Sequence, residues 1–121
     1  MKKLLILFLA FSAISGCTKP AELGDFDVDK WKSDPNGCLG IRAEMIEDIL
    51  KIKPNLLGLY QKKIIKALGQ PESEELYERS QTYYFYYIDP SDKCSEKTAE
   101  EPRILSIRFT ALGIANEVNI R

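Results

Sequence analysis

The spacing of hydrophobic residues along this chain changes twice, and each change predicts a different kind of element. An apolar run at 4–14, interrupted only by Ser12, follows two lysines at the start of the chain. Two segments with apolar residues at helical spacing come next, at about 41–53 and 60–68. From about residue 73 the period becomes two, which is typical of strands with one buried face. The pattern therefore predicts a leader, then helices, then strands.

Both helical segments end at recognisable signals. The apolar face of the first is made of Ile41, Met45, Ile46, Ile49, Leu50 and Ile52. Pro54 is expected to stop this helix at Lys53, because proline lacks the N–H that a helix interior needs. The second helix, within "GLYQKKIIKALGQP", is expected to follow Tyr60 as its N-cap. Gly69 before Pro71 predicts a helix end with a positive φ at the glycine.

Three strands, and an optional short strand ahead of them, are predicted in the second half of the chain. They lie in "ELYE", "TYYFYYID", "RILSIRFT" and "IANEVNI". One-sided alternation in the last two predicts an antiparallel sheet with one face in water. Helices followed by such a sheet predict an α+β fold, in which two helices pack on one face of a three- to four-stranded antiparallel sheet, as a single two-layer domain.

The tyrosine-rich strand leaves a choice of faces. Phe85 has no polar group to keep in water, so we expect it to face the helices. Period two then places Tyr84 and Tyr86 on the open face, together with Arg108 of the next strand. These three residues either stiffen a solvated sheet through cross-strand pairs or form a docking patch for a protein partner.

The apolar run at the start is too short to span a bilayer, which takes about 20 residues. A basic start and a short apolar centre are typical of an export signal. The run ends in "ISGC", residues 14–17, which resembles the bacterial lipobox. This resemblance implies that residues 1–16 are a signal peptide, that Cys17 becomes a lipidated N-terminus, and that residues 17–25 form a tether to a domain at 26–121. A soluble secreted protein is the alternative.

Composition argues against several classes of function. The chain has 17 basic and 18 acidic residues and no histidine. Without histidine, the His-based catalytic triads and the commonest general base are excluded. Removal of Lys2 and Lys3 with the signal peptide would leave a net charge of −3, with charges of both signs interspersed, which does not favour nucleic-acid binding. We therefore expect a protein that is not an enzyme and that needs neither a cofactor nor a small-molecule substrate.

Three aspartates alternate at Asp25, Asp27 and Asp29, which raises the question of calcium. An EF-hand loop that starts at Asp25 needs glycine at its sixth position and glutamate at its twelfth, where this chain has Lys30 and Asn36. No metal is therefore expected. A solvated extended segment that is docked by its large apolar residues, Phe26 and Trp31, is the preferred interpretation.

Cys38 and Cys94 remain once Cys17 is assigned to lipid. Two cysteines outside the cytoplasm favour a disulfide, and two free buried thiols are the alternative. Cys94 lies inside a long segment framed by Pro90 and Pro102. A bond to Cys38 would tie that segment to the helical part of the domain.

Residues 55–120 resemble the SmpA/OmlA (BamE-like) small lipoproteins. The matching positions are Gly58, Ile64, Leu68, Gly69, Pro71 and the aromatic run 83–87. This resemblance implies a short helical pair on a three-stranded antiparallel sheet, and a role as an accessory subunit in outer-membrane protein assembly. The matching residues are structural, so the resemblance implies no binding residues.

Two functions follow from these observations. The first is a lipid-anchored, non-catalytic scaffold or accessory protein, held in the outer membrane facing the periplasm, that binds an envelope protein. The second is a periplasmic inhibitor of a hydrolase, of the lysozyme or β-lactamase inhibitor type, which would insert its 90–102 loop into an active site.

Overall fold

The computed structural model describes residues 23–95 and 100–121. The predicted signal peptide, Cys17 and most of the predicted tether lie outside these ranges, as do residues 96–99 of the predicted inhibitory loop. Within the two ranges, no helix has the length and apolar character that a bilayer crossing requires.

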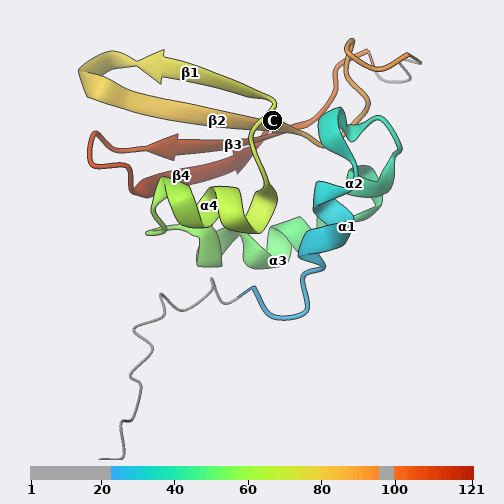
Figure 1. Ribbon diagram of the computed structural model, residues 1–121, viewed down its shortest axis with the longest axis horizontal. Helices are drawn as coiled ribbons and strands as arrows, with labels where there is room; N and C mark the ends of the chain where they lie inside the picture. Colours follow the sequence, from blue (N-terminus) through green and yellow to red (C-terminus); the bar gives the residue numbers. More distant parts are fainter. Residues whose placement is uncertain (1–22, 96–99) are drawn as a thin grey trace, which may run out of the picture.

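Helices precede strands in the described chain, and the predicted α+β class is confirmed. The elements are α1 (Val28–Lys32), the short 3-10 turn η1 (Pro35–Gly37), α2 (Ile41–Glu44), α3 (Ile46–Leu56), α4 (Gln61–Leu68), β1 (Ser73–Tyr77), the turn η2 (Glu78–Ser80), β2 (Gln81–Tyr87), β3 (Ile104–Phe109) and β4 (Ala115–Ile120). The strands pair antiparallel in the order β1-β2-β3-β4. The helices gather beside β4 and at one end of the sheet, and the β1–β2 turn projects away from them (Figure 1).

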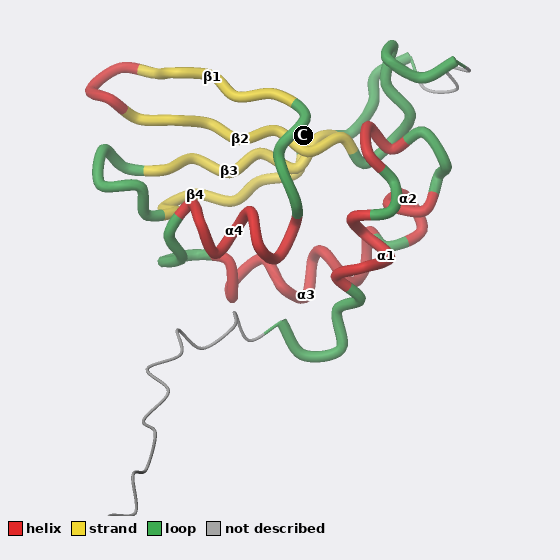
Figure 2. Tube along the Cα trace, viewed as in Figure 1, coloured by secondary structure: helices red, strands yellow, loops and turns green. Residues whose placement is uncertain are grey.

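One continuous core lies between the helices and one face of the sheet (Figure 2). Its members include Leu23, Phe26, Trp31, Met45, Ile49, Ile52, Leu56, Ile64, Leu68, Tyr84, Tyr86, Ile88, Leu105, Ile107, Phe109 and Val118. The apolar residues of α3 and α4 recur at helical spacing, and those of β2 to β4 recur with period two. The sequence pattern therefore accounts for both sides of this core.

The prediction that Pro54 ends the first helix was wrong, because α3 continues through Pro54 to Leu56. Proline in a helix interior removes a hydrogen bond and costs about 3 kcal/mol. Ile52 and Leu56, on either side of Pro54, are both buried, and their packing in the core compensates this cost. The apolar face, rather than the proline, decides where the helix ends.

The aspartate-rich segment is helical, not extended as expected. Asp27 is the N-cap of α1, and its carboxylate accepts a hydrogen bond from the backbone N–H of Lys30 at 3.0 Å. The expected anchors, Phe26 and Trp31, are buried. Leu23 is also buried in the core, so the packed domain includes residues that the sequence assigned to the tether.

The two ends of α4 follow the prediction in the identity of the N-cap and in the sign of φ at Gly69. Tyr60 is the N-cap of α4, and Gly69 has a φ of +82°. The ψ of Gly69 is −177°, however, so the chain leaves α4 extended instead of making a left-handed turn. Glycine alone adopts this backbone conformation readily, and it directs the chain from α4 into β1.

Candidate functional site

The tyrosines that we expected on the open face lie on the opposite side of the sheet. Tyr84 is 5% exposed and Tyr86 is fully buried, and both belong to the core. The Tyr86 hydroxyl donates a hydrogen bond to the carbonyl of Gly69 at 2.8 Å, which lets a tyrosine be buried without an unpaired polar group. Burial raises the pKa of this hydroxyl far above its usual value, and the charge of Glu72 adds to the effect. Tyr84 and Tyr86 therefore form no docking patch.

Tyr84 packs edge-on against Phe109, with 4.6 Å between the ring centroids. Burial raises the pKa of its hydroxyl, with a contribution from Glu74. Its role in this fold is to join β2 and β3 on the helix side.

The open face instead carries an aromatic row of Tyr77, Tyr83 and Phe85. Tyr77 meets Tyr83 edge-on at 5.7 Å, and Tyr83 stacks parallel to Phe85 at 5.8 Å between centroids. The guanidinium of Arg121 lies 5.8 Å from the centroid of Tyr83 and 5.5 Å from that of Phe85. The row thus runs from the exposed strand β1 to an arginine, with Phe85 covered by its neighbours.

Arg108 lies on this open face, as expected. It is the register partner of Tyr83, and it forms a salt bridge of 2.9 Å with Glu117 of β4. Its side chain also donates a hydrogen bond to Asn116. We call Tyr77, Tyr83, Phe85, Arg108 and Arg121 the aromatic face. Two arginines beside stacked rings can recognise aromatic, carboxylate and backbone carbonyl groups of a partner.

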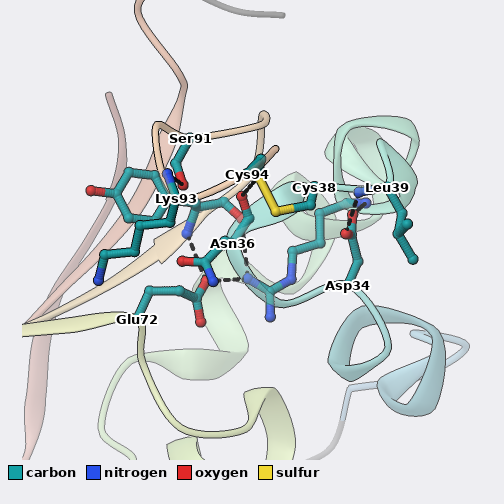
Figure 3. Close-up of a disulfide and its surroundings, with 10 residues drawn as sticks. Asp34, Asn36, Cys38, Leu39, Glu72, Ser91, Lys93 and Cys94 are labelled. Carbon is teal, nitrogen blue, oxygen red and sulfur yellow. Dashed lines mark hydrogen bonds and ion pairs between the residues drawn. A yellow bond between two sulfur atoms is a disulfide. The ribbon is translucent and has the colours of Figure 1, made fainter. Parts of the chain in front are cut away.

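Cys38 and Cys94 form the predicted disulfide, with 5.4 Å between their Cα atoms (Figure 3). The bond joins the chain before α2 to the segment after β2. Backbone hydrogen bonds support it, from Ser91 to the carbonyl of Asn36 at 3.3 Å and from Cys94 to the carbonyl of Ser91 at 3.0 Å. The long segment is therefore tied to the helical end of the domain, as its cysteine indicated.

Gly37 lies where two backbone segments cross in close contact. Its φ is +66°, and a Cβ atom there would lie 2.7 Å from the carbonyl oxygens of both Ile88 and Asp89. Only glycine fits this crossing, because any side chain would overlap backbone atoms.

Arg42, which the sequence analysis did not single out, holds this end of the domain together. It is 2% exposed, and its guanidinium lies 4.4 Å from the centroid of the Trp31 ring. It donates hydrogen bonds to the carbonyls of Trp31 at 3.0 Å and Tyr87 at 3.1 Å, and it forms a buried salt bridge with Glu72. Glu72 also accepts the backbone N–H of Tyr87 at 3.0 Å, so one ion pair joins α2, the start of β1 and the end of β2.

Asp34, also buried, fixes the chain that carries Cys38. Its carboxylate accepts the backbone N–H groups of Leu39 at 2.7 Å and Arg42 at 3.1 Å (Figure 3). Asp34 also stands directly before η1, as the N-cap residue of that turn.

The neck of the long segment is closed by Asp89 and Arg103. The Arg103 side chain donates two hydrogen bonds to the Asp89 carboxylate, at 2.8 and 2.9 Å, and its backbone N–H donates a third. The Arg103 guanidinium holds the pKa of that carboxyl below its usual value. The long segment is thus fastened at its neck by an ion pair and at Cys94 by the disulfide.

Among residues 23–95 and 100–121, no three histidine, cysteine or acidic side chains are arranged to hold a metal ion. No protein-family model, curated protein or solved structure matches this chain. The resemblance to the SmpA/OmlA lipoproteins therefore stays a prediction.

Proposed function

We propose that this chain is a lipid-anchored protein of a bacterial cell envelope, without catalytic activity, that binds another envelope protein through the aromatic face of its sheet. The proposal retains the sequence-based expectation of an accessory role, including one in outer-membrane protein assembly. It replaces Tyr84 and Tyr86 with Tyr77 and Tyr83 as partner-binding residues and keeps Arg108.

The aromatic face is the observation that carries this proposal. Tyrosine and arginine are enriched where proteins bind one another, because they combine a large contact area with hydrogen bonding. Tyr77 is 51% exposed, and Arg121 lies beside the row on the same face. A partner that covers Tyr77 would extend the stacked row.

The proposed anchor fits the position of the first described residues. Segment 23–26 lies beside α3, and together they line a hollow of about 250 Å³. β1 lies at the opposite edge of the domain (Figure 1). A lipid on Cys17 would lie within about 20 Å of Leu23, the reach of six extended residues.

The disulfide also supports an exported protein, since disulfides persist in oxidising compartments. The inhibitor alternative stays a prediction. Its loop is held at the neck by Asp89 with Arg103 and at Cys94 by the disulfide.

Two tyrosines with matched exposure test the binding surface. Tyr77 is 51% exposed on the aromatic face, and Tyr60 is 56% exposed at the start of α4. The full-length variants Tyr77→Ser and Tyr60→Ser would be compared by chemical cross-linking in intact cells. Loss of the cross-linked partner in Tyr77→Ser alone is the expected result. Equal cross-linking in both variants would reject the aromatic face as the binding surface.

The anchor needs a separate test. A Cys17→Ala protein is expected to lose its membrane partition, and the mass of the wild-type protein from membranes should show loss of residues 1–16 and gain of acyl chains. Full retention of Cys17→Ala in the membrane would reject lipid anchoring.

A further inference from the structure

The two edges of the sheet differ in how they are covered. At β4, the connection between α3 and α4 pairs with the start of the strand, since Gly58 donates to the carbonyl of Ala115 and Ala115 donates to that of Leu59, both at 2.8 Å. β1 has β2 as its only neighbouring strand among the described residues. Four of its five residues are exposed, and Leu76 is 82% exposed.

An uncovered edge strand presents backbone N–H and C=O groups that can pair with another strand. In an antiparallel pair, the backbone groups of alternate residues point away from the existing neighbour. β1 is therefore a ready template for strand addition, a mode in which backbone hydrogen bonds give affinity and alternate side chains give specificity.

The side chains of β1 indicate what kind of strand fits. Glu74 and Glu75 follow one another on opposite faces, and Glu78 comes directly after the strand. Leu76 lies between these charges and points to the helix side, as the register partner of Thr82. A matching strand needs basic residues opposite the glutamates and an apolar residue beside Leu76.

We infer that β1 binds an extended segment of a partner protein in which an apolar residue lies between basic residues, and that this segment becomes a fifth strand of the sheet. The inference rests on the proposed function, and it specifies how the same partner would be held next to the aromatic face.

A second copy of this chain fits the edge less well. Antiparallel pairing of two β1 strands about their centre would place Glu75 opposite Glu75 of the other copy. Like charges directly opposite one another destabilise a strand pair. The acidic edge thus favours a basic partner strand over self-association.

The test uses the full mature protein in detergent micelles and two synthetic peptides, one with the order Lys-Thr-Val-Lys-Lys, which can place lysines opposite Glu74 and Glu75 and valine beside Leu76, and one in which glutamate replaces every lysine. The lysine peptide is expected to shift the backbone amide NMR signals of β1 and to slow their hydrogen exchange at least tenfold, while β4 stays unchanged. Shifts at β4 or on the helices, or no binding at all, would overturn the inference.

Charge reversal gives the matched control. In the variant Glu74→Lys/Glu75→Lys, the affinity for the lysine peptide is expected to fall by about tenfold, because like charges then face one another. The glutamate peptide should bind this variant instead. Glu44→Lys/Glu47→Lys, which reverses two exposed charges at α2 and α3, should change neither peptide's affinity. Equal loss in both variants, or slowed exchange at β1 that depends on protein concentration without peptide, would also overturn the inference.

The result can be separated from that of the proposed function. Failure of the peptide to bind, with partner cross-linking still dependent on Tyr77, rejects strand addition alone. Cross-linking that does not depend on Tyr77 rejects the proposed function itself.

Discussion

The two ends of the sheet are held in different ways. At the fastened end, the disulfide, Arg42 with Glu72, and Asp89 with Arg103 join the helices to the strands. At the hairpin end, the β1–β2 turn carries two consecutive residues with positive φ that are not glycine, Arg79 at 60° and Ser80 at 61°. Leu76 and Tyr77 beside this turn are exposed.

This difference indicates where function lies. The buried charged groups of the fastened end, Arg42, Glu72 and Asp34, are all hydrogen-bonded, which explains them as stabilising contacts. Trp31 Nε1 and Asn36 Oδ1 are also buried there, without a hydrogen-bond partner among the described residues. The hairpin end combines two non-glycine residues at positive φ, each with a backbone cost of about 1–2 kcal/mol, with exposed apolar side chains at Leu76 and Tyr77. Local violations of this kind are expected at functional sites.

The largest expected effect comes from breaking the fastened end at Arg42. Arg42→Met leaves the Glu72 carboxylate buried without its cation, so we expect a loss of about 3–5 kcal/mol in the free energy of unfolding, measured in urea. Arg108→Met is the matched control, because its partner Glu117 is exposed, and it should cost less than about 1 kcal/mol. Equal losses of unfolding free energy in the two variants would show that the buried ion pair of the fastened end stabilises the protein no more than an exposed one.

Removing the disulfide should have the next largest effect. Cys38→Ser/Cys94→Ser opens a loop with a sequence separation of 56 residues, and chain entropy predicts a loss of about 2–4 kcal/mol. Urea unfolding of the wild-type protein with and without reductant should give the same difference. A loss below about 0.5 kcal/mol would mean that the polar contacts hold this end without the disulfide.

The hairpin end should respond in the opposite direction. Ser80→Gly relieves a positive φ, and we expect the protein to become about 1 kcal/mol more stable. Ser73→Gly, in β1 itself, should instead destabilise by about 0.5–1 kcal/mol, because glycine is unfavourable inside a strand. If Ser80→Gly instead destabilised the protein, the positive φ of Ser80 would not be a source of strain at this end.

The smallest effect is expected from acid at the neck of the long segment. The folded pKa of Asp89 is lowered by Arg103, so its stabilisation is complete above the unfolded value of about 3.9 and is lost as the pH falls through the folded pKa. Asp89→Asn should cost less than about 1 kcal/mol at pH 7, and this cost should vanish at the lowest pH of a urea unfolding series. A cost that does not change with pH would mean that the charge of Asp89 contributes nothing.

Sequence reasoning succeeded where the signal is local. Helical and period-two spacing predicted the α+β class, and the positive φ of Gly69 followed from glycine before proline. The disulfide followed from counting cysteines in a chain that was expected to be exported. The faces of β2 were assigned wrongly because "YYFYY" has aromatic residues on both sides, so period two alone cannot choose between them. Ile88 shares its face with Tyr84 and Tyr86, and this single aliphatic residue was the signal that could have decided correctly.

Other features could not be predicted. Arg42 and Glu72 are 30 residues apart, and no spacing rule pairs them before the fold is known. The backbone strain at Arg79 and Ser80 could not be predicted either, because neither residue type is typical of a turn with positive φ. Both the ion pair and the strained turn are recognised only in the folded structure.

Photo-cross-linking from two exposed leucines tests most directly whether the hairpin end binds the partner. Leu76 is 82% exposed on β1, and Leu39 is 69% exposed at the fastened end. A photoreactive side chain would replace each leucine in turn in the full-length protein, in the cells that make it. The expected result is an adduct with one envelope protein from position 76 and none from position 39. An adduct from position 39 with none from position 76, or equal adducts from both, would contradict the account.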